Sequence, residues 1–148
     1  MIVNLQRKVK LEARGYAGFL AEALAAAEEA GGGEAAVAFV SDRRMRELNR
    51  FFRGKDATTD VLSFPHEPDE FEPPAADGRV PAGFLGDIVI SAEQAERQAG
   101  ESGLSLETEI KQLILHGLLH LCGYDHETDS GEMDRRELEL RAALGIDQ

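Results

Sequence analysis

The chain has 148 residues, one cysteine and a formal net charge of −12. This length suits one domain that buries roughly two thirds of its unfolded surface, and a lone cysteine excludes an internal disulfide. With no apolar secretory signal at the N-terminus and no apolar stretch long enough to cross a bilayer, we expect a cytoplasmic protein outside the membrane.

The N-terminal part of the chain predicts a strand, a helix and a second strand. The segment VNLQRKVKL (3–11) alternates well enough for a strand. An alanine-rich stretch follows over residues 15–33 and predicts a helix that stops at three consecutive glycines. The apolar segment AAVAFVS (35–41) predicts a buried strand.

A basic helix is predicted next, with Ser41 as its N-cap. Met45, Leu48 and Phe52 fall at helical spacing and form the expected core stripe. The segment RRMRELNRFFRGK (43–55) holds six of the sixteen basic residues, while residues 57–148 have a net charge of −14. A polyanion would bind at this segment if anywhere, although a solvated basic face balancing the acidic remainder explains it equally well.

Two further strands and a short helix are predicted in the middle of the chain. VLSFP (61–65) and FLGDIVIS (84–91) predict the strands, and Ser91 with Gln94 forms a capping box for a helix that ends at Gly100. An irregular acidic loop lies between the strands and contains all five prolines: Pro65, Pro68, Pro73, Pro74 and Pro81.

The C-terminal part predicts two helices joined by a reversal. A strongly apolar helix spans about 106–122, Gly123 supplies left-handed backbone for a turn, and a last helix runs from about 130 to 144. Because strands and helices mix without strict alternation and no linker divides them, we predict one α/β (α+β) domain over residues 1–148.

Three of the four histidines lie in HGLLHLCGYDH (116–126). His116 and His120 are four residues apart and therefore share one helix face, with Cβ atoms roughly 5–6 Å apart. The bend at Gly123 can return His126 to the same point. Three imidazoles suit one zinc ion per chain and leave its fourth position open, which is typical of a catalytic site.

The alternative is that these histidines are core or surface residues placed by chance. The spacing of all three together strongly disfavours this alternative. His66 fits a loop residue better than a fourth ligand. Asp125 can orient a ligand imidazole or simply form the turn. Cys122 fits core packing, since a thiolate would make an unusually soft site.

The spacing H-x3-H-x5-H resembles that of the metzincin peptidases, whose motif places a glutamate directly after the first histidine. This chain has Gly117 there. Without that carboxylate, peptide hydrolysis lacks its general base, so a peptidase is disfavoured. Phosphodiester cleavage is less demanding, because the metal can activate water or stabilise charge, but it needs a further cation for the phosphoryl oxygens.

Three segments together resemble the YbeY family of bacterial endoribonucleases: LNRFFRGKDATTDVLSFP (48–65), LGDIVIS (85–91) and HGLLHLCGYDH (116–126). The resemblance implies a metal-dependent endoribonuclease specific for single-stranded RNA, with no DNA substrate. It implies a role in 16S rRNA 3′-end maturation and ribosome quality control, with ribosomal proteins and assembly GTPases as partners. It also implies a small mixed sheet of four to five strands flanked by helices.

Carried over by position, the resemblance assigns the zinc ligands to His116, His120 and His126 and the functional arginine to Arg53. A guanidinium at Arg53 could grip a phosphate, whereas the alternative is an exposed arginine favoured by the helix dipole. Phe52 departs from the family's usual tyrosine, which puts any hydroxyl function there in doubt. Three residues of the same motif stay open between a site role and capping: Lys55, Asp56 and Asp60.

A second hypothesis is a ribosome-assembly binding factor whose zinc is structural. The acidic surface and the proline-rich loop suit protein contacts better than RNA contacts. A variant that keeps its metal but cannot cleave RNA separates the two hypotheses.

Overall fold

In the computed structural model, residues 1–67 and 83–146 are described. Four strands form a single sheet: β1 (Ile2–Asn4), β2 (Glu34–Val40), β3 (Val61–Pro65) and β4 (Phe84–Ser91). The helices are α1 (Ala17–Ala26), α2 (Asp42–Arg53), α3 (Ala92–Ser102), α4 (Leu106–Leu121) and α5 (Glu132–Leu144), with short 3-10 turns η1 (Ala13–Tyr16) and η2 (Glu28–Ala30). The predicted proline-rich loop falls mostly on residues 68–82, outside the described residues.

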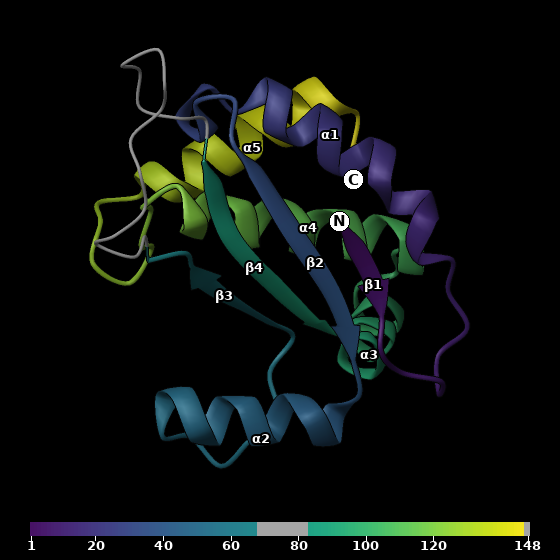
Figure 1. The fold of residues 1–148 in the computed structure, drawn as a ribbon. Coiled ribbons are helices and arrows are strands. Elements are labelled where there is room, and N and C mark those ends of the chain that lie inside the picture. The colour runs from purple at the N-terminus through teal and green to yellow at the C-terminus, as the bar shows by residue number, and fades with distance from the viewer. Residues whose placement is uncertain (68–82, 147–148) are drawn as a thin grey trace.

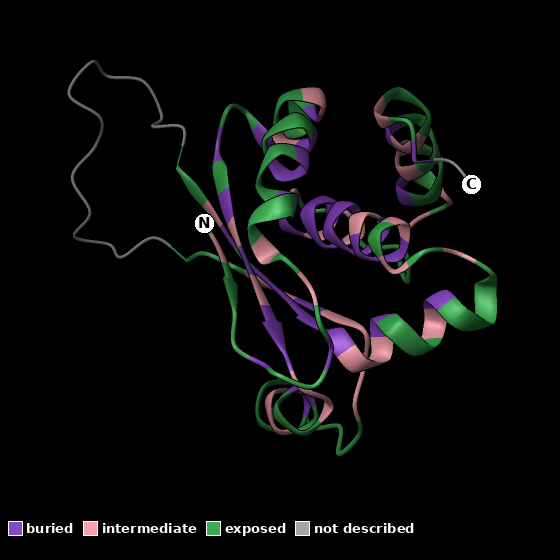
Figure 2. Ribbon diagram, turned by 90° about the vertical axis from the view of Figure 1, so that its right-hand side faces the viewer, coloured by how far each residue is buried: buried purple, intermediate pink, exposed green. Residues whose placement is uncertain are grey.

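The sheet is mixed, as predicted, with the order β1-β2-β4-β3. β1 and β4 both run parallel to β2, while β3 pairs antiparallel with β4 and forms one edge. Helices cover both faces (Figures 1 and 2): α1, α4 and α5 pack with the large core cluster, and α2 lies on the opposite face. The prediction of one mixed α/β domain is therefore confirmed.

Helix α4 runs through the centre of the molecule and contacts β3 and β4 of the sheet as well as α1, α3 and α5 (Figure 1). Ile110, Ile114 and Leu118 are fully buried, because neighbours surround the helix on most sides. The helix packs closely against the sheet at Gly117, where an added Cβ would lie 2.7 Å from Cγ2 of Ile88. This close approach brings the histidine face of α4 beside β3. Within the described ranges, no helix is long and apolar enough to cross a membrane.

Two N-terminal elements are shorter than predicted. The strand expected over 3–11 covers only Ile2–Asn4, because the Gln6 side chain exchanges two 2.9 Å hydrogen bonds with the backbone of Val9 and forms a local turn. The helix expected over 15–33 is interrupted at Ala27, whose backbone is extended.

Helix caps follow the sequence closely, with one exception. The hydroxyls of Ser41 and Ser91 accept hydrogen bonds from the first turns of α2 and α3, as predicted. The end predicted for α3 at Gly100 is wrong: the helix continues to Ser102, and Gly103 provides the left-handed C-cap at φ 69°.

The core stripe predicted for α2 is only partly correct. Met45 is fully buried in a cluster with Val40, Leu62 and Val89 of the sheet. Phe52 is 58% exposed instead, with its ring packed edge-on against Phe64 of the edge strand β3 at 5.0 Å. The buried position near this end belongs to Asn49, whose amide donates to the carbonyl of Ala57 at 2.8 Å.

Candidate metal centre and cleft

The structure brings the three predicted histidines together. His116 and His120 lie on one face of α4, and the chain reverses at Gly123, whose φ of 99° is left-handed. The reversal returns His126 to the same face, so that one nitrogen from each ring lies within 4.8 Å of the others. The cluster can therefore hold a metal ion.

Hydrogen bonds orient two of the three rings. His116 Nδ1 lies 2.9 Å from Oε1 of Glu137 on α5, and His120 Nδ1 lies 3.0 Å from the carbonyl oxygen of Tyr124. A carbonyl oxygen and an ionised carboxylate can only accept a hydrogen bond. We therefore assign the proton of each ring to Nδ1. Both Nε2 lone pairs are then free for a metal, the arrangement in which an outer partner fixes the tautomer of a ligand histidine.

The sequence analysis did not identify Glu137. No spacing in the chain connects positions 116 and 137, which lie on different helices, so only the packing of α5 against α4 reveals the contact. Asp125, considered as a partner for a ligand ring, instead forms the turn: its carboxylate accepts from the backbone N–H of Glu127 at 3.1 Å.

The charge states around the cluster favour metal binding. Burial, followed by the proximity of His116, lowers the pKa of His120, so its imidazole is neutral and able to coordinate near pH 7. Burial raises the pKa of the Glu137 carboxyl, but the hydrogen bond from His116 and the charge of Arg141 outweigh it and bring this pKa below its ordinary value. Glu137 is therefore an ionised acceptor.

A second network anchors the turn that delivers His126. The Tyr124 hydroxyl donates to Oε2 of Glu29 at 2.8 Å, and Arg136 of α5 binds both oxygens of the same carboxylate at 2.8 and 3.0 Å. The hydrogen bond from Arg136 is the largest of the effects that lower the pKa of Glu29 to about 2. The reversal is thus tied to both η2 and α5.

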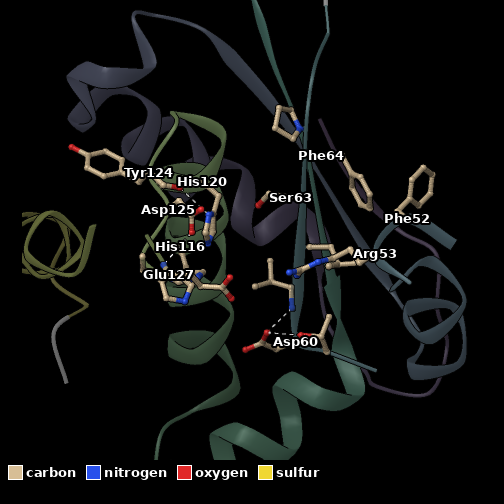
Figure 3. A pocket seen from close by; sticks show the side chains of 15 residues that line it. Phe52, Arg53, Asp60, Ser63, Phe64, His116, His120, Tyr124, Asp125 and Glu127 are labelled. Atoms are coloured by element: carbon tan, nitrogen blue, oxygen red, sulfur yellow. Dashed lines mark hydrogen bonds between the residues drawn. The ribbon is translucent and has the colours of Figure 1, made fainter. Parts of the chain in front are cut away.

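The histidines open onto a cleft of about 760 Å³, within the range of ligand-binding sites. Its walls are the end of α2, residues 59–65, the histidine face of α4 and the turn at 124–127 (Figure 3). Arg53, the predicted functional arginine, lies across β3 from the histidines and points into this cleft. It makes no ion pair or side-chain hydrogen bond with any residue that the structure describes.

The three residues left open beside Arg53 have different surroundings. Asp56 forms a two-pronged ion pair with Arg46 at 2.9 and 3.1 Å, which accounts for its place in the motif. Asp60 accepts from the backbone N–H of Val61 at 2.8 Å and also lines the cleft. Lys55 is exposed and is not part of the cleft wall.

The remaining histidine and the cysteine lie as predicted. His66 follows β3, is exposed and stands outside the three-histidine cluster, with its ring 5.6 Å from that of Phe84. Cys122 is half-buried against the large core cluster, and burial raises the pKa of its thiol, so it is a packing residue.

The close packing at Gly117 adds a steric argument against a metzincin-type peptidase. A side chain there would meet the fully buried Ile88, and the carbonyl of Gly117 already accepts a 3.0 Å hydrogen bond from Ser63. The glutamate of the peptidase motif cannot be accommodated at this position without moving α4 away from the sheet.

A mixed α/β domain in which three convergent histidines, able to hold a metal ion, share one cleft with an arginine is the arrangement expected of a metal-dependent hydrolase. Comparisons with known proteins give the family. The family model described as "Endoribonuclease YbeY" matches residues 1–145, and the chain therefore belongs to the YbeY family of endoribonucleases.

Individual relatives agree with this assignment. The chain is 49% identical over 133 residues to "Endoribonuclease YbeY" of Moorella thermoacetica, covering 84% of this chain and 82% of that protein. It is 41% identical over 152 residues to the protein of the same name from Pelotomaculum thermopropionicum, covering 99% and 97%. The solution structure of TM1509 from Thermotoga maritima is similar, with a TM-score of 0.61 at 29% identity over 97% of this chain and 89% of that one.

Proposed function

We propose that this protein is a zinc-dependent endoribonuclease that cuts single-stranded RNA, with the metal on His116, His120 and His126 and the scissile phosphate on Arg53. The observation that supports it most strongly is the convergence of three imidazole nitrogens within 4.8 Å at one wall of a cleft, which also contains a guanidinium with no ion-pair partner among the described residues.

The histidine cluster fits zinc in donor type and in size. Nitrogen ligands at about 2.0–2.1 Å from a tetrahedral ion stand about 3.4 Å from one another, so ring nitrogens within 4.8 Å need only small rotations. A bound zinc ion would supply a Lewis acid and an activated water molecule.

The charges of the cleft support a requirement for a divalent cation. The cleft is lined by one basic side chain, Arg53, and by three acidic ones, Asp60, Asp125 and Glu127, so its formal charge is −2 when the imidazoles are neutral. This net negative charge would repel a phosphodiester. Two further positive charges at the histidines bring the sum to zero and make phosphate binding feasible.

The position of Arg53 supports its proposed role, because its side chain extends from the last turn of α2 into the cleft (Figure 3). A planar guanidinium can donate two parallel hydrogen bonds to phosphoryl oxygens, and these strengthen as negative charge develops in the transition state. The Arg53 guanidinium forms no ion pair with a described carboxylate, so its N–H donors remain available to a phosphate.

Metal analysis of protein purified without a histidine tag tests the zinc centre, and cleavage of a single-stranded RNA with and without chelator tests the reaction. We expect about one zinc per chain and loss of cleavage after chelation. Arg53→Ala should lower cleavage at least tenfold with zinc content unchanged. Arg43→Ala is the matched control, since Arg43 is 91% exposed at the other end of α2 and pairs with Glu47. Full activity without metal, or equal activity of Arg53→Ala and the wild type, contradicts the proposal.

In the cell, we propose that the substrate is rRNA in the cytoplasm and that cleavage contributes to maturation of the 16S rRNA 3′ end and to ribosome quality control. Ribosomal proteins and assembly GTPases are the proposed partners, as the family resemblance implies. Complementation of a strain that lacks the endogenous enzyme tests this role. If Arg53→Ala restores rRNA maturation without cleaving RNA, the protein acts as an assembly factor with a structural zinc instead.

A further inference from the structure

Two adjacent phenylalanines at the end of α2 are exposed beside the cleft. Phe51 is 81% exposed and Phe52 is 58% exposed, although burying a phenylalanine would contribute about 1.5–3 kcal/mol. Scattered exposed apolar residues are ordinary, but two neighbouring aromatic rings at the mouth of a cleft form a patch that suits a ligand.

The two rings belong to a row of three aromatic rings that starts on the sheet. Phe64 of β3 packs edge-on against Phe52 with ring centroids 5.0 Å apart, and Phe52 packs in the same way against Phe51 at 4.8 Å. Phe52 and Phe64 both line the cleft, next to Arg53 (Figure 3). An edge-to-face contact covers one face of only one of its two rings, and Phe51 and Phe52 stay 81% and 58% exposed, so apolar ring surface remains available to a ligand.

The positive charges at this end of α2 form no ion pair with a described residue, although Arg50 is close enough to Asp56 to help lower the pKa of that carboxyl. Segment 43–55 contains six cations, and the three nearest the start of the helix pair with Glu47 or Asp56. The other three form no ion pair with any residue in 1–67 or 83–146: Arg50, Arg53 and Lys55. Cations and exposed rings therefore occur together, in a chain whose net charge is −12.

Unpaired nucleic acid combines repeated negative charge with repeated planar rings, so it matches this surface in both respects. We infer that Phe52 and Phe51 are a stacking platform for consecutive unpaired bases of the RNA next to the phosphate held by Arg53, an inference that rests on the proposed nuclease function. Bases in a duplex already stack on their neighbours and cannot use the platform. The platform thus gives a physical reason for preferring single strands.

Binding of the zinc-loaded protein to a short single-stranded RNA analogue that it cannot cleave tests the platform separately from cleavage. Fluorescence anisotropy with this analogue should show a Kd raised roughly 5- to 150-fold in Phe52→Ala, the change that corresponds to about 1–3 kcal/mol for one stacked base. Phe51→Ala should act in the same direction, and Phe52→Tyr should bind like the wild type. Phe52→Leu keeps an apolar side chain without a ring and should bind as weakly as Phe52→Ala.

Matched controls separate stacking from general surface effects. Leu5→Ala removes another exposed apolar side chain, 66% exposed next to β1 at the opposite edge of the sheet, and should leave the Kd unchanged. Duplex RNA of the same sequence should bind Phe52→Ala and the wild type equally. Because the chain has no tryptophan, Phe52→Trp also introduces a single tryptophan, which can be excited apart from the two tyrosines and whose emission should be quenched by single-stranded RNA.

The outcomes distinguish this inference from the proposed function. Normal cleavage together with an unchanged Kd and KM for Phe52→Ala overturns the platform and leaves the nuclease intact; an apolar patch of this kind would then serve a protein partner. Ring-dependent binding without metal-dependent cleavage supports the platform and overturns the nuclease. Equal losses for single-stranded and duplex RNA, or full binding by Phe52→Leu, also overturn stacking.

Discussion

Glu137 controls the orientation of one proposed metal ligand, and its replacement should weaken zinc binding. Its side chain is only 12% exposed and lies between two partners, His116 and Arg141, at 2.9 Å each. In Glu137→Gln the carbonyl oxygen can still accept from His116, but the amide group then faces the donors of Arg141. In Glu137→Ala the acceptor is lost, and His116 can rotate away from the metal position.

The size of the effect follows from the number of contacts removed. Loss of a partner that orients a ligand histidine typically lowers metal affinity 10- to 100-fold, which corresponds to about 1.4–2.7 kcal/mol. We expect Glu137→Gln near the lower limit and Glu137→Ala near the upper one. Alanine also leaves Arg141 without this carboxylate, and the Nε of that arginine is already buried without a partner in the described structure.

Competition against a chromophoric zinc chelator at pH 7.5 measures the affinities directly, and circular dichroism verifies that each variant is folded. Glu139→Gln is the matched control, because it makes the same change two residues away on α5, where the side chain is 66% exposed. Wild-type affinity in Glu137→Ala, or an equal loss in Glu139→Gln, would refute the reasoning that the carboxylate acts through His116.

Three further predictions concern stability. Gly117→Ala should lower the free energy of unfolding by about 1–2 kcal/mol in urea titrations, because overpacking against Ile88 exceeds the gain in helix propensity; an increase would contradict the close approach. Glu29 has its pKa lowered to about 2, so its ion pair with Arg136 stabilises the fold above pH 4.5 and is lost as the pH falls toward 2. As the pH falls from 4.5 to 2, the free energy of unfolding of the wild type should fall by about 1–2 kcal/mol more than that of Glu29→Gln, a range that allows for solvent screening at this partly exposed pair. Parallel plots of unfolding free energy against pH for the two proteins would exclude the linkage. Zinc at one hundred times its Kd should raise the unfolding free energy of metal-free protein by about 2.7 kcal/mol, and an unchanged melting temperature would argue against a site present only in the folded state.

Local signals in the sequence were sufficient for most elements of the fold. Capping by Ser41 and Ser91, the apolar pattern of α4 and the left-handed glycines after α4 and α5 all act within a few residues, so they can be read from the chain. The length of the first strand and the end of α3 were predicted incorrectly. A turn formed by the Gln6 side chain follows the strand, which ends at Asn4, and α3 continues two residues past Gly100 to a left-handed cap at Gly103.

The sequence by itself determined that the three histidines would meet, because helical spacing and one left-handed glycine are local geometry. Only the tertiary structure decided what surrounds them: Glu137 behind His116, Tyr124 anchored to Glu29, and Arg53 facing the histidines across β3. It also decided that Phe52 is exposed, since a helical stripe is buried only as far as the sheet beneath it extends. These contacts join residues far apart in the chain, and packing, not spacing, creates them.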